Sequence, residues 1–222
     1  VSHRSAASVD VIKKYLPSFV GLNLEQEIKN LSYVLEKPQK PFVAIIGGAK
    51  IETKLPVINQ LLKTADYVLV GGAVANDFLL AQEQEVGESL VDKDYISQAK
   101  KLLDNFQVDV CRCGKHQPIS NFQKNYKLQN SKLFQNSKIK NSKLILPTDF
   151  VWHKNKILDI GEKTIKNYCA IIKKAKTIVW NGPMGYFEDK KFAKGTNAIA
   201  KAILNSQAKA VIGGGETGEA VK

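Results

Sequence analysis

Short apolar segments alternate with amphipathic segments along most of the chain. Residues 42–46, 67–70, 177–180 and 210–212 are apolar runs, and each of them leads into a turn that contains glycine. Units of strand, loop and helix in this order are typical of a parallel sheet covered by helices. The pattern therefore predicts an α/β fold, a three-layer Rossmann-like parallel sheet with helices on both faces.

Helical periodicity lies on both sides of the first apolar run. Apolar residues at three- and four-residue spacing predict a helix that Asn23 caps and that continues to Glu36, ahead of Pro38. Residues 52–62 have the same period, which predicts a helix directly after the first strand.

Four predicted strands end in glycine-bearing loops, which contain residues 47–48, 71–72, 181–183 and 213–215. Ligands of open parallel sheets bind beyond the carboxyl ends of the strands, where helix N-termini offer free amide groups to anions. One such loop would be weak evidence, because glycine serves tight turns everywhere. Four loops at equivalent strand ends favour a phosphate-bearing ligand.

Residues 105–143 break this pattern. They are rich in Asn, Gln, Ser and Lys, and Asn-Ser-Lys recurs at 130–132, 136–138 and 141–143. We interpret the segment as a low-complexity insertion. Cys111, Cys113 and His116 lie within it, but three potential ligands at this spacing do not make a zinc site, so we expect incidental residues.

Composition adds a few limits to this interpretation. With 222 residues, of which 44% are hydrophobic, the chain can form one main domain. Half of its net charge of +12 comes from residues 104–143, which hold eight basic and two acidic residues, so we expect no nucleic-acid partner. The sequence has no apolar run of eighteen residues, no signal peptide and only three cysteines. We therefore expect a cytoplasmic protein without membrane contact.

Three motifs resemble the hallmarks of phosphoglycerate kinases, in the family's order. Residues 47–54 read GGAKIETK, residues 180–188 read WNGPMGYFE, and residues 213–217 read GGGET. Residues 71–79, 86–90 and 158–161 resemble further stretches of the same family. The P-loop pattern G-x-x-x-x-G-K-[ST] is absent, and a dinucleotide-linked dehydrogenase is disfavoured because no G-x-G-x-x-G follows a strand.

The resemblance implies an enzyme that transfers a phosphoryl group between 1,3-bisphosphoglycerate and ADP, giving 3-phosphoglycerate and ATP in glycolysis. It implies that residues 1–22 join two lobes and that residues 23–222 form the nucleotide-binding C-terminal lobe, interrupted at about 105–143. We expect the acid substrate to bind through an N-terminal lobe that the chain lacks, with Arg4 as its one counterpart here. We therefore expect a monomer that has no turnover alone.

The resemblance also implies roles for single residues. Lys54, Gly214 and Gly215 match catalytic positions, and Glu216 matches the ligand of Mg²⁺, which accompanies ADP or ATP. Glu188 matches the acid that binds the ribose; the other interpretation of Glu188 is an ordinary acid at a helix start. The full set implied to bind nucleotide is Gly48, Ala49, Lys50, Lys54, Gly72, Ala73, Leu90, Leu158, Asn181, Pro183, Glu188, Gly213, Gly214, Gly215, Glu216 and Thr217.

The chain departs from the family pattern at three positions. Glu216 stands where the family has aspartate, and Ala73 and Ile157 stand where it has glycine. The connection between residues 150 and 158 is also short, which leaves open how the outer wall of an adenine slot is made. As the alternative, Glu216, the insertion and the missing N-terminal lobe favour a non-catalytic nucleotide-binding module derived from the same family.

Overall fold

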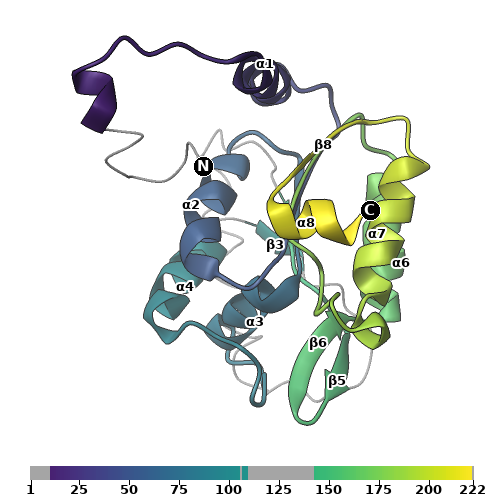
Figure 1. Ribbon diagram of the computed structural model, residues 1–222. Coiled ribbons are helices and arrows are strands. Elements are labelled where there is room, and N and C mark those ends of the chain that lie inside the picture. The colour runs from purple at the N-terminus through teal and green to yellow at the C-terminus, as the bar shows by residue number, and fades with distance from the viewer. Residues whose placement is uncertain (1–10, 106, 110–142, 222) are drawn as a thin grey trace, which may run out of the picture. The chain divides into compact units, whose positions relative to one another are not determined.

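The structure is a computed structural model that describes residues 11–105, 107–109 and 143–221 (Figure 1). The chain divides into two compact units, Val1–Lys37 and Pro38–Lys222. The first holds the short helix η2 (Ile12–Lys14) and helix α1 (Leu22–Glu36). The amide of Glu25 donates to the carbonyl of Gly21, at 3.0 Å, so Gly21 begins the helix. The predicted helix is thus confirmed, but Asn23 lies in its first turn and does not cap it.

The second unit is built on a six-stranded sheet in which every pair of neighbours is parallel. In spatial order its strands are β3 (Gln107–Asp109), β4 (Lys143–Ile145), β2 (Tyr67–Val70), β1 (Phe42–Ile46), β7 (Thr177–Asn181) and β8 (Lys209–Gly213). The four strands predicted from apolar runs are all present. The predicted parallel sheet is confirmed.

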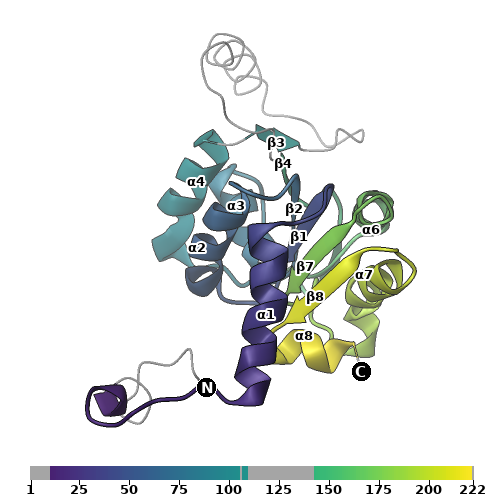
Figure 2. The ribbon, with the colours of Figure 1, turned by 90° about the horizontal axis from the view of Figure 1, so that it is seen from above.

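Helices cover both faces of this sheet (Figure 2). On one face lie α2 (Ile51–Leu61), α3 (Gly72–Ala81) and α4 (Ile96–Asn105), and on the other lie α6 (Glu162–Ile172) and α7 (Lys194–Leu204). The short helices are η3 (Lys93–Tyr95), η4 (Lys190–Phe192) and α8 (Gly215–Ala220). The three-layer α/β architecture is therefore as predicted, and the helix expected at 52–62 is α2.

The core lies around strand β1, all five residues of which are buried. A strand covered by helices on both faces must be apolar throughout, which explains its uninterrupted hydrophobic run. Val43 and Ile45 belong to a buried cluster that includes Tyr168 of α6. The Tyr168 hydroxyl group donates to the carbonyl oxygens of Val70 and Ile145, at 2.7 and 3.0 Å, so this buried polar atom is satisfied.

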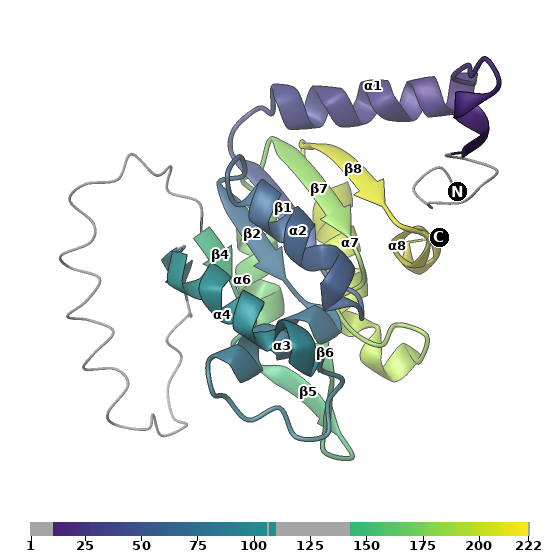
Figure 3. The same cartoon turned by 90° about the vertical axis from the view of Figure 1, so that its left-hand side faces the viewer.

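A separate antiparallel hairpin, β5 (Phe150–His153) and β6 (Lys156–Ile160), follows the sheet strand β4 (Figure 3). Lys154 and Asn155 form its turn with φ of 46° and 60°, the left-handed values that two-residue hairpin turns favour. Asp149, just before the hairpin, accepts from the amides of Lys163 and Thr164 at the start of α6. Asp149 thereby joins the chain just before the hairpin to the start of α6.

The predicted insertion at 105–143 overlaps the sheet at both of its ends. Residues 107–109 form β3 and residue 143 begins β4, and these two strands pair with each other. Residues 110–142, including Cys111, Cys113 and His116, lie outside the described residues. Within the described part of the chain, we find no helix with the length and apolar character that a bilayer crossing requires.

Candidate functional site

The loops that follow β1, β2 and β7 are joined by hydrogen bonds between their backbones. The amide of Gly47 donates to the carbonyl of Asn181, and that of Gly48 donates to the carbonyl of Pro183, both at 2.9 Å. The amide of Gly72 donates into the same cluster, also at 2.9 Å. These three N–H groups are therefore engaged within the protein. This differs from the expectation that the glycine loops offer free amides to an anion.

Close packing is the physical reason for glycine at these positions. A β-carbon on Gly47 would stand 2.1 Å from the carbonyl oxygen of Pro183. One on Gly182 would stand 2.2 Å from the carbonyl carbon of Gly47, and Gly182 has a φ of 95°, which a side chain disfavours. The loops after β1 and β7 can approach each other only because both residues lack a side chain.

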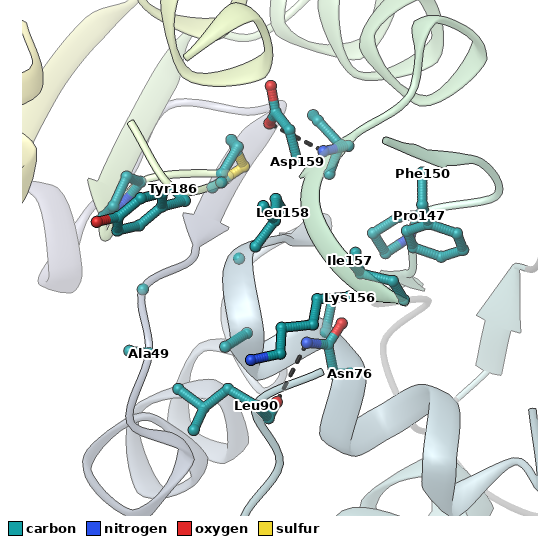
Figure 4. A pocket seen from close by; sticks show the side chains of 18 of the residues that line it. Ala49, Asn76, Leu90, Pro147, Phe150, Lys156, Ile157, Leu158, Asp159 and Tyr186 are labelled. Carbon is teal, nitrogen blue, oxygen red and sulfur yellow. Dashed lines mark hydrogen bonds between the residues drawn. The ribbon is translucent and has the colours of Figure 1, made fainter. Parts of the chain in front are cut away.

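A cavity of about 300 Å³ opens in front of this loop cluster (Figure 4). Its volume is in the range of small-molecule sites. One part of the wall is apolar and includes Leu90, Ile157 and Leu158. Glu188 and Glu216, both exposed, bring carboxylates to the rest of the wall. The cavity can thus take a ligand that has a flat apolar part and a polar part.

The outer wall is made by the loop 86–92 together with the β5–β6 hairpin. The amide of Glu88 donates to the carbonyl of Asn155, at 2.8 Å, and the amide of Ile157 donates to the hydroxyl of Ser89, also at 2.8 Å. The short connection between residues 150 and 158 is therefore sufficient to close this side. Ala73 and Ile157, which replace family glycines, both line the cavity.

Two buried carboxyl groups hold the parts of this site together. Asp77 accepts from the amide of Asp92, at 2.6 Å, and burial raises the pKa of Asp77 to about 6. Asp159 accepts from the amides of Ile160 and Gly195, at 2.9 and 2.7 Å, and burial raises the pKa of Asp159 to about 6 as well. Asp77 fixes the outer loop to α3, and Asp159 joins β6 to the start of α7.

Lys54 lies in the first turns of α2, half-buried beside the loop cluster. Its ammonium group donates to the side-chain oxygen of Asn181. Burial lowers the pKa of Lys54, and the nearby charge of Glu216 acts in the opposite direction. A β-carbon placed on Gly48 would have the Lys54 side chain 3.8 Å away and a Glu216 oxygen 3.7 Å away. Lys54 and Glu216 therefore both lie close to Gly48, whereas Lys50 is exposed.

The loop after β8 is packed differently from the other three. Gly214 has a φ of 95° and is exposed, and a β-carbon on Gly215 would meet nothing within 4 Å. Thr217 is fully buried, and its hydroxyl accepts from the amide of Gly182, at 2.7 Å. The Thr217 side chain thus links α8 to the β7 loop, while the glycines before it leave their backbone accessible.

The structure brings many of the sequence-predicted residues to one cavity. Its wall contains Gly48, Ala49, Gly72, Ala73, Leu90, Leu158, Pro183, Glu188 and Glu216. The remaining predicted residues do not line it: Lys50, Lys54, Asn181, Gly213, Gly214, Gly215 and Thr217. Arg4 lies outside the described residues. Glu188 lies in a turn, directly before Asp189, which caps η4.

Sequence reasoning missed several lining residues. These include Asn76, Glu88, Pro147, Phe150, Lys156, Met184 and Tyr186. Pro147 and Phe150 follow β4, a strand whose end carries no glycine and so gave no signal. Asn76 did carry a signal in the sequence, because it is a polar residue among the apolar residues of α3. The structure shows that it is buried.

The fold and the cavity are those of an α/β domain that binds its ligand at the switch point of an open parallel sheet. In sequence the chain passes from β1 to β2 on one side and later to β7 on the other, so the carboxyl ends of β1 and β7 form the switch point of the sheet. The cavity lies there, where α/β domains of this class bind nucleotides.

Comparison with known proteins makes the assignment specific. The family model of phosphoglycerate kinase matches residues 1–222. The phosphoglycerate kinase of Herpetosiphon aurantiacus is 39% identical over 230 residues, which cover 100% of this chain and 53% of the relative. That of Leptospira biflexa is 41% identical over 223 residues, covering 99% of this chain and 52% of the relative.

Solved structures agree with this. The Pyrococcus horikoshii phosphoglycerate kinase superposes with a TM-score of 0.74 at 31% identity, covering 99% of this chain and 53% of that one. The Coxiella burnetii enzyme gives a TM-score of 0.70 at 32% identity, with 90% and 49% covered. The chain belongs to the phosphoglycerate kinase family, and it spans about half the length of the relatives it matches.

Proposed function

We propose that this chain forms the nucleotide-binding half of a phosphoglycerate kinase, which transfers a phosphoryl group between 1,3-bisphosphoglycerate and ADP. The observation that carries the proposal is the cavity at the switch point of the sheet. It is lined at once by residues from each of the three family motifs, represented by Gly48, Pro183 and Glu216. As part of the same proposal, the protein acts as a cytoplasmic monomer in glycolysis, without nucleic-acid or membrane partners.

The cavity wall suggests how ADP or ATP is held. The apolar part, with Leu90 and Leu158, takes the base, and the exposed carboxylate of Glu188 accepts hydrogen bonds from the ribose hydroxyls. The phosphates then extend toward Gly48 and the loop after β8. Lys54 lies next to Gly48 and can exchange its Asn181 contact for a phosphate oxygen. Its ammonium group would offset charge on the transferring phosphoryl group.

The proposal includes Mg²⁺, which would accompany the phosphates of the nucleotide. The Glu216 carboxylate at the cavity wall is a suitable ligand for this ion. Mg²⁺ keeps several waters and takes one or two carboxylates besides phosphate oxygens. Among the described residues no group of three or more His, Cys, Asp or Glu side chains could hold a metal ion by itself. Glu216 at the cavity wall supplies one carboxylate. Glu216, whose side chain is one methylene longer than aspartate, would be the residue of this chain that holds the ion, and the ion would supply positive charge that offsets the charge of the phosphates.

Phosphoryl transfer requires the acid substrate to be held in line with the nucleotide while water is excluded. We propose that the binding site for 3-phosphoglycerate or 1,3-bisphosphoglycerate is completed by an N-terminal lobe, with Arg4 contributing from this chain. The 222-residue polypeptide alone then binds nucleotide but shows no turnover. Turnover near that of a complete enzyme in a coupled assay would contradict this part of the proposal.

A second candidate is a nucleotide-binding module that performs no catalysis. Glu216, Ala73 and Ile157 favour it, because all three depart from the family pattern and all three line the cavity. Adding a separately produced N-terminal lobe of a related kinase distinguishes the two. Restored turnover supports the kinase, and binding of MgADP without any turnover supports the module.

Calorimetric titration of the chain with MgADP tests the proposed nucleotide site. Glu188→Ala should weaken binding about tenfold, because a carboxylate that accepts from two hydroxyls is lost. Glu219→Ala is the control: it removes an exposed carboxylate from α8 that does not line the cavity, and it should leave the affinity unchanged. Absence of MgADP binding to the parent chain would overturn the proposed function.

A further inference from the structure

One polar atom in the cavity wall has no partner. Asn76 lies on α3, lines the cavity and is 1% exposed. Its side-chain nitrogen donates to the carbonyl oxygen of Leu90, at 3.1 Å (Figure 4). Its side-chain oxygen, Oδ1, has no hydrogen-bond partner, and among the described residues it is the one buried side-chain nitrogen or oxygen in this condition. A buried acceptor without a donor is unfavourable unless a ligand or water completes it.

The orientation of this amide is determined by its surroundings. The Leu90 carbonyl is an acceptor, so it must face the NH₂ group of Asn76; the reversed amide would place two oxygens against each other. The loop that carries Leu90 is held in place by the bond from the amide of Asp92 to Asp77. Asn76 therefore presents an acceptor, and not a donor, on the side away from Leu90.

The neighbours of Asn76 restrict what could complete it. In Figure 4 its amide lies between Leu90 and Ile157, in the apolar part of the wall. This part suits a flat heteroaromatic ring, and a ring that satisfies Oδ1 must carry an N–H donor on its edge. Lys156 lines the same region and is exposed, so its ammonium group is a competing donor that the experiment must separate.

We propose that Asn76 Oδ1 accepts a hydrogen bond from the exocyclic amine of a 6-aminopurine and thereby selects adenine over 6-oxopurines. This inference rests on the proposed nucleotide function and adds base selection to it. A 6-oxopurine would direct its own oxygen at Oδ1, and Asn76 cannot turn over without losing its bond to Leu90. The amide is thus a specificity-determining group and takes no part in phosphoryl transfer.

Calorimetric titrations of the full chain with MgADP and with MgIDP test the inference, because the two bases differ only at C6 and N1. The parent chain should bind MgIDP about tenfold more weakly than MgADP, since one hydrogen bond is replaced by a repulsive contact and a factor of ten is about 1.4 kcal/mol. In Asn76→Ala the ratio of the two dissociation constants should fall to about one. Asn76→Leu, of similar volume, should give the same ratio if loss of packing weakens the alanine variant.

The ratio separates base selection from a structural role. If Asn76 only supports the outer loop, both variants weaken the two nucleotides equally and the ratio of the parent is retained, which overturns the inference. Equal affinity of the parent for both nucleotides also overturns it while the proposed function stands, and so does a ratio that disappears in Lys156→Met. If neither nucleotide binds to the parent, the proposed function fails and this inference fails with it.

Discussion

The glycine-rich loops of this protein form two groups with opposite packing. Gly47 and Gly182 stand where a β-carbon would overlap the neighbouring backbone, whereas Gly215 has nothing within 4 Å of that position. In sequence all of them are glycines at the end of an apolar run. The first group lets two loops touch, and the second leaves the backbone at the start of α8 accessible. The same residue type therefore serves stability at β1 and β7 and access at β8.

The largest effect should come from adding a side chain to a glycine of the packed group, which consists of Gly47 and Gly182. Gly47→Ala should lower the free energy of unfolding by about 3 kcal/mol or more, because the new methyl group meets the Pro183 carbonyl, a backbone atom that cannot rotate away. Urea denaturation measures this. Gly218→Ala, at a helical glycine with open space around it, is the control and should be neutral or slightly stabilising. Similar stabilities of the two variants would show that the contrast between the loops is not real.

The second prediction concerns Asp159, which joins the site to α7. Its folded-state pKa of about 6 lies above the ordinary value of 3.8, so the folded protein binds this proton more tightly than the unfolded chain does. Its contribution is fully present below pH 4 and is lost as the pH rises through 6. The unfolding free energy of the parent minus that of Asp159→Asn should fall by about 2–3 kcal/mol over this window.

Denaturation at a series of pH values measures this difference. Asp104→Asn, at an exposed position, is the control, and its difference from the parent should not change over the same window. A difference that rises with pH for Asp159→Asn would mean that the carboxylate is stabilised in the fold, contrary to its burial.

The third prediction concerns the ammonium group of Lys54, which donates to the side chain of Asn181 in the loop after β7. Lys54→Met keeps the side-chain length but removes the charge, and it should weaken MgADP binding by about 2 kcal/mol, the scale of a charged hydrogen bond. Calorimetry gives the change in affinity. Lys63→Met, at an exposed residue just after α2, should bind like the parent. If both variants bind equally well, Lys54 does not contact the nucleotide.

The smallest effect should come from adding a side chain to Gly215, the glycine with nothing within 4 Å of its β-carbon position, which we call the open group. Gly215→Ala should change the unfolding free energy by less than about 0.5 kcal/mol, because its β-carbon meets no atom of the protein. If a phosphate approaches this backbone, the same methyl group should weaken MgADP binding by about 1 kcal/mol. A variant that loses stability instead would place Gly215 in the packed group.

Much of the sheet could be predicted because its strands are marked by patterns of neighbouring residues in the sequence. Each central strand is a continuous apolar run, and each run is bounded by glycine. Strand β3 was not predicted, because Gln107–Asp109 has mixed polarity and lies in a segment of low-complexity character. The cap expected at Asn23 was wrong by a small margin, since Gly21 accepts the first helical bond.

The motifs also placed much of the site, because residues that follow strands of one parallel sheet must gather at one edge. The outer wall could not be predicted in this way. It depends on Ser89 meeting Ile157 and on Asp77 meeting Asp92, and neither pair is marked by spacing. The chain brings them together only when the hairpin folds onto the loop 86–92.

The sequence by itself determined the α/β class, the strands at the centre of the sheet and the family, because apolar runs and short motifs are properties of neighbouring residues. The tertiary structure alone decided which glycines are packed and which are open, why Asp159 is buried, and that Asn76 presents an unpaired acceptor. Those properties depend on the atoms that surround a residue in space. Residues such as Gly47 and Gly215 look alike in the chain, and only their surroundings distinguish them.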